Sequence, residues 1–242
     1  MLTIRPTPNL AGMSISGDYH DLLNLYDALL EIVGEEVKPG HEYEMPVMQI
    51  HAICFELREA WQGNRLVEFV ENGFDINTQQ NLKTIGPQRN VYFSTRIFLP
   101  QMLFAAMSLC DFVEMASRQQ KIPALNRDIQ TIQLFQAEIA TTLQDQLDAP
   151  SAKLLAQLIY GSVPRYRSFC TQYVDMLTEK YLKQTTEKRR LQILTIARRL
   201  NELGTDYQRL VAELAETAAE LECRIADLET ISEPPILADR EW

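Results

Sequence analysis

The sequence has few glycines and no long apolar run. Its nine glycines are scattered over 242 residues, and none forms a Walker or dinucleotide-binding loop. The longest apolar stretch, residues 97–109, contains Pro100 and Gln101 and is shorter than the roughly 20 residues of a membrane-spanning helix. No apolar segment follows a basic flank at the start, so no secretory signal is expected. These absences predict a soluble protein without standard nucleotide-fold enzymology.

Cysteine and histidine are also scarce. The histidines lack the i+3 or i+4 spacing that places two metal ligands on one helical face, and the common serine and cysteine nucleophile motifs are absent. We therefore expect no metal and no cofactor. The cysteines lie far apart in apolar or helical patterns, which predicts reduced, mostly buried thiols in a cytoplasm. These residues are His20, His41 and His51, and Cys54, Cys110, Cys170 and Cys223.

The net charge of −10 is unevenly distributed. Residues 150–205 carry ten basic and four acidic residues, whereas residues 206–242 carry three basic and ten acidic residues. One basic segment therefore precedes an acidic one, and this asymmetry bears on possible partners.

The first hundred residues alternate between strand and helix patterns. Polar and apolar residues alternate in the strands, whereas apolar residues recur every three or four positions in the helices. Ser16 or Asp18 can cap the first helix. We expect strands near 2–4 and 13–15, followed by a helix to Val33 and a loop over 35–45. A second helix is expected from Pro46 to Gly63, and a strand over 65–70 ends at an Asn72–Gly73 turn. A polar loop with Gly86 and Pro87 then leads to a strand over 91–99.

After Pro100 only helical spacing remains. Helices are expected over 101–120, 126–147, 150–160, 164–182 and 186–203, and a last helix, with Thr205 and Gln208 as a capping box, continues to Leu228. The fold class predicted is α+β, with a small, mainly antiparallel sheet of three to five strands and a C-terminal helical bundle. The domains predicted are 1–149, 150–232 and a tail over 233–242, with one continuous domain as the alternative.

Several stretches resemble a bacterial family of unknown function. They are LTIRPTPNLAG at the start, ISGDYHDLLNLYDALLEIVG (15–34), FELREAWQG (55–63), NRLVEFVENG (64–73), NVYFS (90–94) and TEKRRLQILTIARRL (186–200). The resemblance spans most of the chain but implies no reaction, cofactor or partner. The family's second motif resembles CYDIRHAxQG, and here Glu56 and Glu59 replace its Asp and His. A function that depends on that Asp or that imidazole is therefore in question.

Acidic residues near the WQG motif offer one enzymatic hypothesis. Paired carboxylates beside arginines could bind a divalent ion and a phosphorylated substrate. Solvated acids on helical faces are the more common explanation. The catalytic candidates would be Asp18, Glu56, Glu59 and Glu68, and the candidate binding residues are Arg58, Trp61, Gln62, Arg65 and Asn72.

The basic segment offers a nucleic-acid hypothesis. Its cations could line a groove for phosphates, but they lose that role if the acidic last helix packs antiparallel against them. The candidates are Arg165, Arg167, Lys188, Arg189, Arg190, Arg198 and Arg199.

The last helix offers a third hypothesis. Its apolar stripe has near-heptad spacing, which suits pairing with a protein partner or with its own copy through residues 206–229. We therefore expect a non-catalytic interaction or regulatory component of a bacterial cytoplasmic system, such as stress or phage defence, that contacts no membrane. Nucleic-acid binding and an enzyme acting on a phosphorylated substrate are the alternatives.

Overall fold

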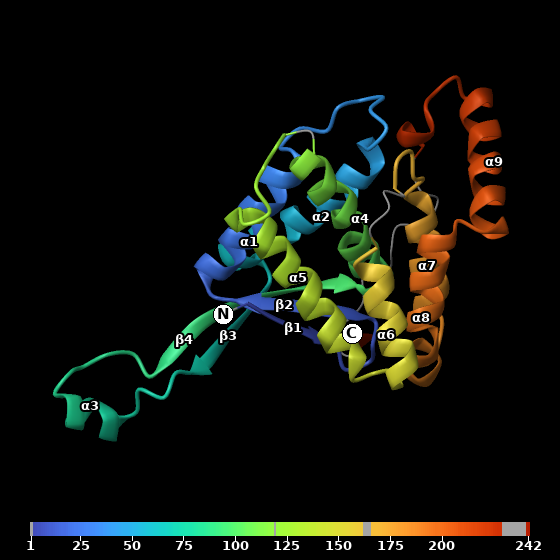
Figure 1. Cartoon of the computed structure of the whole chain (residues 1–242). Helices are drawn as coiled ribbons and strands as arrows, with labels where there is room; N and C mark the ends of the chain where they lie inside the picture. Colours follow the sequence, from blue (N-terminus) through green and yellow to red (C-terminus); the bar gives the residue numbers. More distant parts are fainter. Residues whose placement is uncertain (1, 119, 162–165, 229–240) are drawn as a thin grey trace.

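A four-stranded antiparallel sheet underlies the helices (Figure 1). The strands are β1 (Thr3–Pro6), β2 (Gly12–Gly17), β3 (Leu66–Glu71) and β4 (Arg89–Phe98), in the order β1-β2-β4-β3. This computed structural model describes residues 2–118, 120–161, 166–228 and 241–242. The fold class predicted from the sequence, α+β with a small antiparallel sheet, is confirmed.

β4 is longer than either of its neighbours. Its residues 93–98 pair with β2, and its residues 89–94 pair with β3. The two neighbours therefore overlap only at Phe93 and Ser94, so β3 and the first half of β4 continue beyond the sheet as a two-stranded ribbon. The short helix α3 (Ile76–Leu82) lies at the end of this ribbon.

Two helices lead from the sheet to the ribbon. Asp18 caps α1 (Tyr19–Val33) in a reciprocal box with Asp21, because each carboxylate accepts a hydrogen bond from the other residue's backbone N–H. After a loop, α2 (Glu44–Glu59) passes into a π-helical turn, η1 (Ala60–Asn64), in which Gly63 has a φ of 84°. Such a positive φ favours glycine, and the turn directs the chain into β3.

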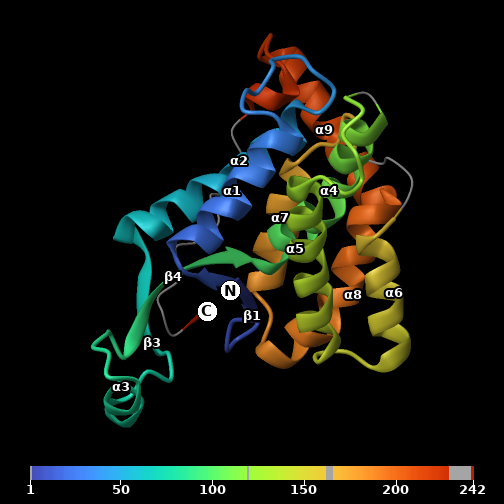
Figure 2. The ribbon, with the colours of Figure 1, turned by 60° about the vertical axis from the view of Figure 1, so that its left-hand side comes forward.

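The remaining helices pack with α1, α2 and the sheet, and together these elements form the body of the molecule (Figure 2). The remaining helices are α4 (Leu99–Arg118), α5 (Arg127–Gln144), α6 (Ala149–Ile159), α7 (Gln172–Leu182), α8 (Thr186–Glu202) and α9 (Thr205–Glu220), followed by the 3-10 turn η2 (Ile225–Asp227). α4 lies at the centre and contacts α5, α6, α7 and α8. Among the described helices, α4 is the one long and apolar enough to span a membrane, but 72% of its most apolar window is buried. Its burial in the core accounts for its composition.

The hydrophobic core takes in side chains from both halves of the chain. Phe104 and Phe112 of α4 belong to the same buried cluster as Phe135 of α5, Tyr173 of α7 and Ile193 of α8. The domain boundary near residue 149 stays a prediction, and the core around α4 is shared across that position.

The structure corrects four details. A helix, α3, occupies part of the expected polar loop. The helix expected from residue 164 begins at Gln172, because residues 166–171 form turns in which Ser168 has a φ of 54°. The last helix ends at Glu220 instead of Leu228, and the N-cap of α9 is Gly204, which makes no side-chain hydrogen bond. The capping box expected at Thr205 and Gln208 is therefore wrong.

The C-terminal part folds back on the body at two places. Arg224 donates two hydrogen bonds to the Glu44 carboxylate, at 2.8 and 3.0 Å, and is also paired with Asp227. The ring of Trp242 stacks on Phe98 with ring centroids 4.8 Å apart, and the Trp242 carbonyl oxygen accepts a hydrogen bond from Asn9. Residues 241–242 of the predicted tail therefore contact the sheet.

Candidate functional site

The two-stranded ribbon projects from one side of the body as an arm (Figures 1 and 2). We define the arm as residues 65–93: Arg65, β3, the tip with α3, and the first half of β4. All but one residue of β3 are exposed, and α3 has no buried residue. A protruding two-stranded ribbon gains little stability on its own, so its sequence should reflect other contacts.

One face of the arm is apolar. Side chains alternate between the faces of a strand, so Val67, Phe69, Val91 and Phe93 share one face, in the cross-strand pairs Val67–Phe93 and Phe69–Val91. Phe69 is 66% exposed, and Val67 and Val91 are also exposed. We call these four residues the arm patch.

The arm patch continues the face that the body buries. Ile15 and Met13 of β2 pair with Thr95 and Ile97 of β4, and all four are buried. Along β4 this face changes from buried Ile97 to half-buried Phe93 and then to exposed Val91. Apolar side chains therefore persist on the core face beyond the point where the helices stop covering it.

Amide side chains fix the tip of the arm. Asn72 donates to the Pro87 carbonyl at 3.0 Å and to Asn90 Oδ1 at 3.1 Å, and accepts a hydrogen bond from the Phe74 N–H. Gln79 donates to the carbonyls of Phe74 and Gly86. The tip still exposes three large apolar side chains: Ile76, Leu82 and Ile85.

Glu56 of α2 fastens the root of the arm. Its carboxylate accepts two hydrogen bonds from Arg65, at 2.7 and 2.8 Å, and one from Thr95 Oγ1 at 3.0 Å. One side chain thus joins α2 to the chain entering β3 and to β4. Burial raises the pKa of Glu56, but the hydrogen bonds from Arg65 and Thr95 outweigh it, so the pKa lies below its usual value.

The catalytic candidates have separate local partners. Asp18 caps α1, Glu56 binds Arg65 and Thr95, and Glu59 accepts a hydrogen bond from Asn64 at 3.0 Å. Glu68 lies exposed on the arm, opposite Tyr92. Arg58 lies over the Phe55 ring. Within the described ranges, no group of three His, Cys, Asp or Glu residues could hold a metal ion.

The binding candidates form the elbow between α2 and the arm. Trp61 is half-buried in edge-to-face contact with Tyr19 and Tyr26, which attaches η1 to α1. Gln62 is exposed on η1. Arg65 lies at the root and Asn72 at the tip, so the set spans the arm without converging on a cavity.

The basic candidates are dispersed. Arg189 is buried and donates to the carbonyls of Asn9 and Leu182, at 2.9 and 2.6 Å. Arg190 donates to the Gln146 carbonyl, and Arg167 pairs with Glu42. Lys188, Arg198 and Arg199 are exposed on α8, whereas Arg165 lies outside the described residues.

The acidic last helix does not neutralise α8 through ion pairs between their described residues. No ion pair among the described residues joins α8 to α9. Tyr207 of α9 is buried, and Leu210, Val211 and Leu214 pack partly against the core. α9 therefore uses part of its apolar stripe within the molecule.

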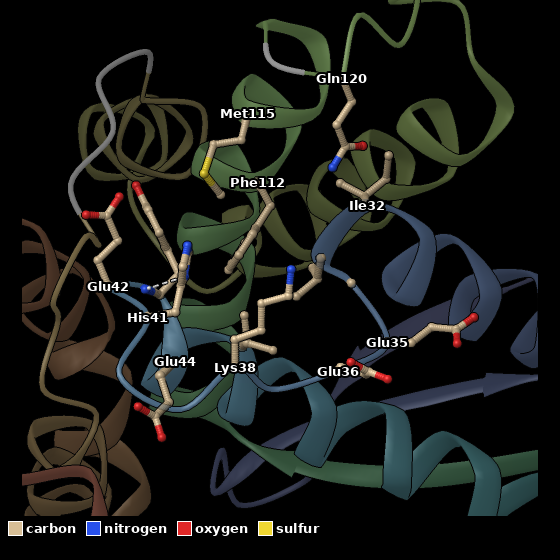
Figure 3. A pocket seen from close by; sticks show the side chains of 14 residues that line it. Ile32, Glu35, Glu36, Lys38, His41, Glu42, Glu44, Phe112, Met115 and Gln120 are labelled. Carbon is tan, nitrogen blue, oxygen red and sulfur yellow. Dashed lines mark hydrogen bonds between the residues drawn. The ribbon is translucent and has the colours of Figure 1, made fainter. Parts of the chain in front are cut away.

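A polar-rimmed pocket of about 560 Å³ lies between the loop before α2 and the end of α4. In Figure 3, Phe112 and Met115 of α4 face His41 and Lys38 of that loop. The Tyr43 hydroxyl donates to Asp111 at 3.3 Å, and burial together with the Asp111 charge raises its pKa to about 12. Of the acids at the rim, Glu42 and Glu44 are paired with Arg167 and Arg224. Tyr43, Glu42 and Glu44 therefore serve the fold.

Sequence reasoning missed the arm patch and the apolar tip. The signal was the alternation of β4, in which Val91, Phe93, Thr95 and Ile97 form one apolar series. That pattern predicts that helices cover one face of β4, but it does not say at which residue of β4 the cover ends.

Comparison with known proteins gives one match, to a protein family. A family model described as "Domain of unknown function (DUF6904)" matches residues 2–239. A search of curated proteins and a search of solved structures each found no match.

Proposed function

The chain belongs to the DUF6904 family of unknown function, and we propose, from its surface, that it is a non-catalytic protein. It acts by binding a protein chain through its arm. The observation that carries this proposal is the arm patch. It presents apolar side chains on a core-type face that no described element covers.

Exposed apolar groups at this density are unusual for a free surface. Single exposed apolar residues are ordinary, but a contiguous group on a protruding element is typical of an interaction site. Burying the patch would remove its side chains from water, which is the main favourable term in protein association. A protein surface is the partner whose chemistry matches an extended apolar ribbon.

The polar candidates support a binding role over catalysis. Among the acidic and basic candidates, Glu56 and Arg65 hold the root of the arm, and Asp18 caps α1. Glu56 in particular keeps both strands of the arm attached to α2. Two of the residues that suggested chemistry, Glu56 and Arg65, are thus used to position the arm.

The proposal includes a bacterial origin, a cytoplasmic location and a regulatory role in a system such as stress or phage defence. All four cysteines are free, which suits a reducing compartment. Burial raises the pKa of the Cys54 thiol to about 12 and that of Cys170 to about 11, so both are poor nucleophiles. Binding of a partner through residues 206–229 stays a prediction.

Photo-cross-linking tests the proposal. A photoreactive phenylalanine analogue replaces Phe69, and a matched variant carries it at Leu191, an α8 residue that is 77% exposed but lies off the arm. The expected result is one identified protein cross-linked at position 69 and absent at position 191. Equal labelling at both positions, or none at position 69, contradicts the proposal.

A further inference from the structure

The outer edge of β3 is open. β3 is the last strand in the sheet order, and in the described part of the chain no strand pairs with this edge. Such an edge presents backbone N–H and C=O groups ready to pair with another extended strand. A strand is therefore the element that fits the edge, and the apolar patch beside it adds side-chain contact.

The charge of the arm suits a second copy of this chain as the source of that strand. The arm contains three basic residues and three acidic residues and is therefore neutral, so the chain's net charge of −10 belongs entirely to the rest of the molecule. Two copies that approach by their bodies meet like-charge repulsion. Two copies that approach by their arms meet at the neutral part and keep the acidic bodies at opposite ends. These basic and acidic residues are Arg65, Lys83 and Arg89, and Glu68, Glu71 and Asp75.

Resting on the proposed function, we propose that the partner of the arm is a second copy of this chain, paired antiparallel through β3 about a twofold axis at Glu68. Pairing of identical strands about a twofold axis perpendicular to the sheet keeps the two arm patches on one continuous face. The two four-stranded sheets then join at their β3 edges.

We choose the register of the β3–β3 pair by comparing which side chains each register places opposite one another. With Glu68 at the axis, Val67 opposes Phe69 of the second copy, and Leu66 opposes Val70. Arg65 opposes Glu71, which brings opposite charges together on each side of the axis, beside the Arg65–Glu56 and Arg89–Glu71 pairs that each copy already contains. Shifting the centre to Phe69 would instead place Val67 opposite Glu71. The register at Glu68 is the one that matches apolar with apolar and basic with acidic residues.

One pair of residues destabilises the dimer in this register. The two Glu68 carboxylates meet at the axis, and like charges directly opposite each other weaken a strand pair. Opposite-charge pairs flank them, so Glu68→Gln is expected to tighten the dimer, whereas Glu71→Gln weakens it. Each change should be about two- to fivefold in the dissociation constant.

The arrangement also accounts for the exposed tip. β3 has six residues, which span about 20 Å at roughly 3.4 Å per residue. In an antiparallel pair centred on Glu68, the tip of each arm therefore reaches the root of the other. Ile76, Leu82 and Ile85 then lie near the elbow of the second copy.

Analytical ultracentrifugation of the full chain is the first test. The expected mass is twice 27.8 kDa for the wild-type chain and for Leu191→Glu, and 27.8 kDa for Phe69→Glu. Phe69 and Leu191 are both exposed in the single chain, so each substitution should leave the circular dichroism spectrum unchanged. A monomeric wild-type chain, or a dimer that Phe69→Glu leaves intact, overturns the proposal.

Disulfide cross-linking tests the register. Glu68→Cys places the new thiol opposite itself and should form a covalent dimer under mild oxidation. Phe69→Cys should not, because its Cα would lie more than about 7 Å from its symmetry mate, and Leu191→Cys is the control away from the arm. Cross-linking at position 69 and not at position 68 overturns the register.

The two proposals fail separately. If the chain is a monomer but a photo-cross-linker at position 69 still captures another protein, the second-copy inference fails and arm binding stands. If the chain is a monomer and nothing is captured, both fail.

Discussion

At the residue scale, the root of the arm depends on the ionised Glu56 carboxylate. Glu56→Gln keeps the shape but weakens the hydrogen bonds to Arg65, which are charge-assisted in the wild-type chain. We expect faster hydrogen exchange of the β3 amides in this variant. Glu59→Gln is the control, because the Glu59 carboxylate accepts a hydrogen bond from Asn64 across the same turn and, among the described residues, none from Arg65 or Thr95. Unchanged exchange in Glu56→Gln would show that the arm is held by other contacts.

The pKa of Glu56 sets the pH at which this contribution disappears. The pKa is lower in the folded chain than in the unfolded chain, whose value is about 4.3. The stabilisation is therefore complete above that unfolded value and is lost as the pH falls through the folded pKa. The difference in unfolding free energy between wild type and Glu56→Gln should thus shrink on acidification below about pH 4.3.

Gly12 is a second residue with a specific requirement. A Cβ at this position would lie 2.1 Å from the Ile97 carbonyl oxygen and 2.9 Å from the Trp242 ring. Gly12→Ala should lower the unfolding free energy by about 1–3 kcal/mol, measured by urea denaturation. Gly161→Ala serves for comparison, because its Cβ would meet its nearest atom at an ordinary 3.6 Å. Equal stability of the two variants would contradict the expected clash.

Arg189 is predicted to affect stability and not nucleic-acid affinity. Arg189→Met removes the hydrogen bonds to the Asn9 and Leu182 carbonyls and should cost about 1–3 kcal/mol in thermal or urea unfolding. The exposed Arg198→Met should change stability little. Salt-sensitive binding of short DNA or RNA that disappears in Arg198→Met would instead favour the nucleic-acid alternative.

At the scale of elements, the tip of the arm is separable from the fold. Asn72 lies opposite Gln88 in the β3–β4 register and donates its N–H to the Gln88 carbonyl, so an Asn-Gly pair can replace residues 73–87 as a two-residue hairpin turn. None of the α3 residues that this removes is buried. The melting temperature should change by less than about 4 °C, the equivalent of roughly 1 kcal/mol for a chain of this size. Loss of cooperative unfolding would show that the tip stabilises the body.

Periodicity predicted most elements because most of them have one buried face. α1, α2, α4, α5 and α8 carry apolar stripes against the core, and their approximate ranges are confirmed. α3 escaped prediction because it buries nothing and so has no apolar stripe. The apolar residues after Glu220 continue the stripe of α9, but Glu222 adopts a φ of 51° and the helix has already ended. Local spacing does not report such a backbone reversal.

The candidate site was predicted only in part. The sequence indicated residues 56–72 as a dense polar region, and these residues do form the elbow and root of the arm. The role of residues 56–72 depends on Thr95 and on where the helices that cover the sheet end. Thr95 and these helices lie outside residues 56–72 in the sequence. Exposure of the arm patch is thus a tertiary property that alternation in β4 alone does not specify.

At the scale of the whole molecule, α4 ties the two halves together. Its side chains pack against helices on both sides of residue 149, so a fragment of residues 1–149 would expose the face that α7 and α8 cover. We expect this fragment to be aggregated or to lack a cooperative thermal transition, measured by calorimetry beside the full chain. A cooperative transition in the fragment would instead support an independent N-terminal domain.

The position of α4 also has a consequence for synthesis. The chain leaves the ribosome N-terminus first, at a rate that separates α4 from α8 by seconds. During that interval a helix with the apolar length of a membrane span, residues 99–118, has emerged after α1, α2, β2 and β4, which contact it, but before α5, α6, α7 and α8, which cover the rest of it. The nascent chain therefore displays at mid-synthesis an incompletely covered apolar segment of the kind that chaperones bind, until α5, α6, α7 and α8 pack on it.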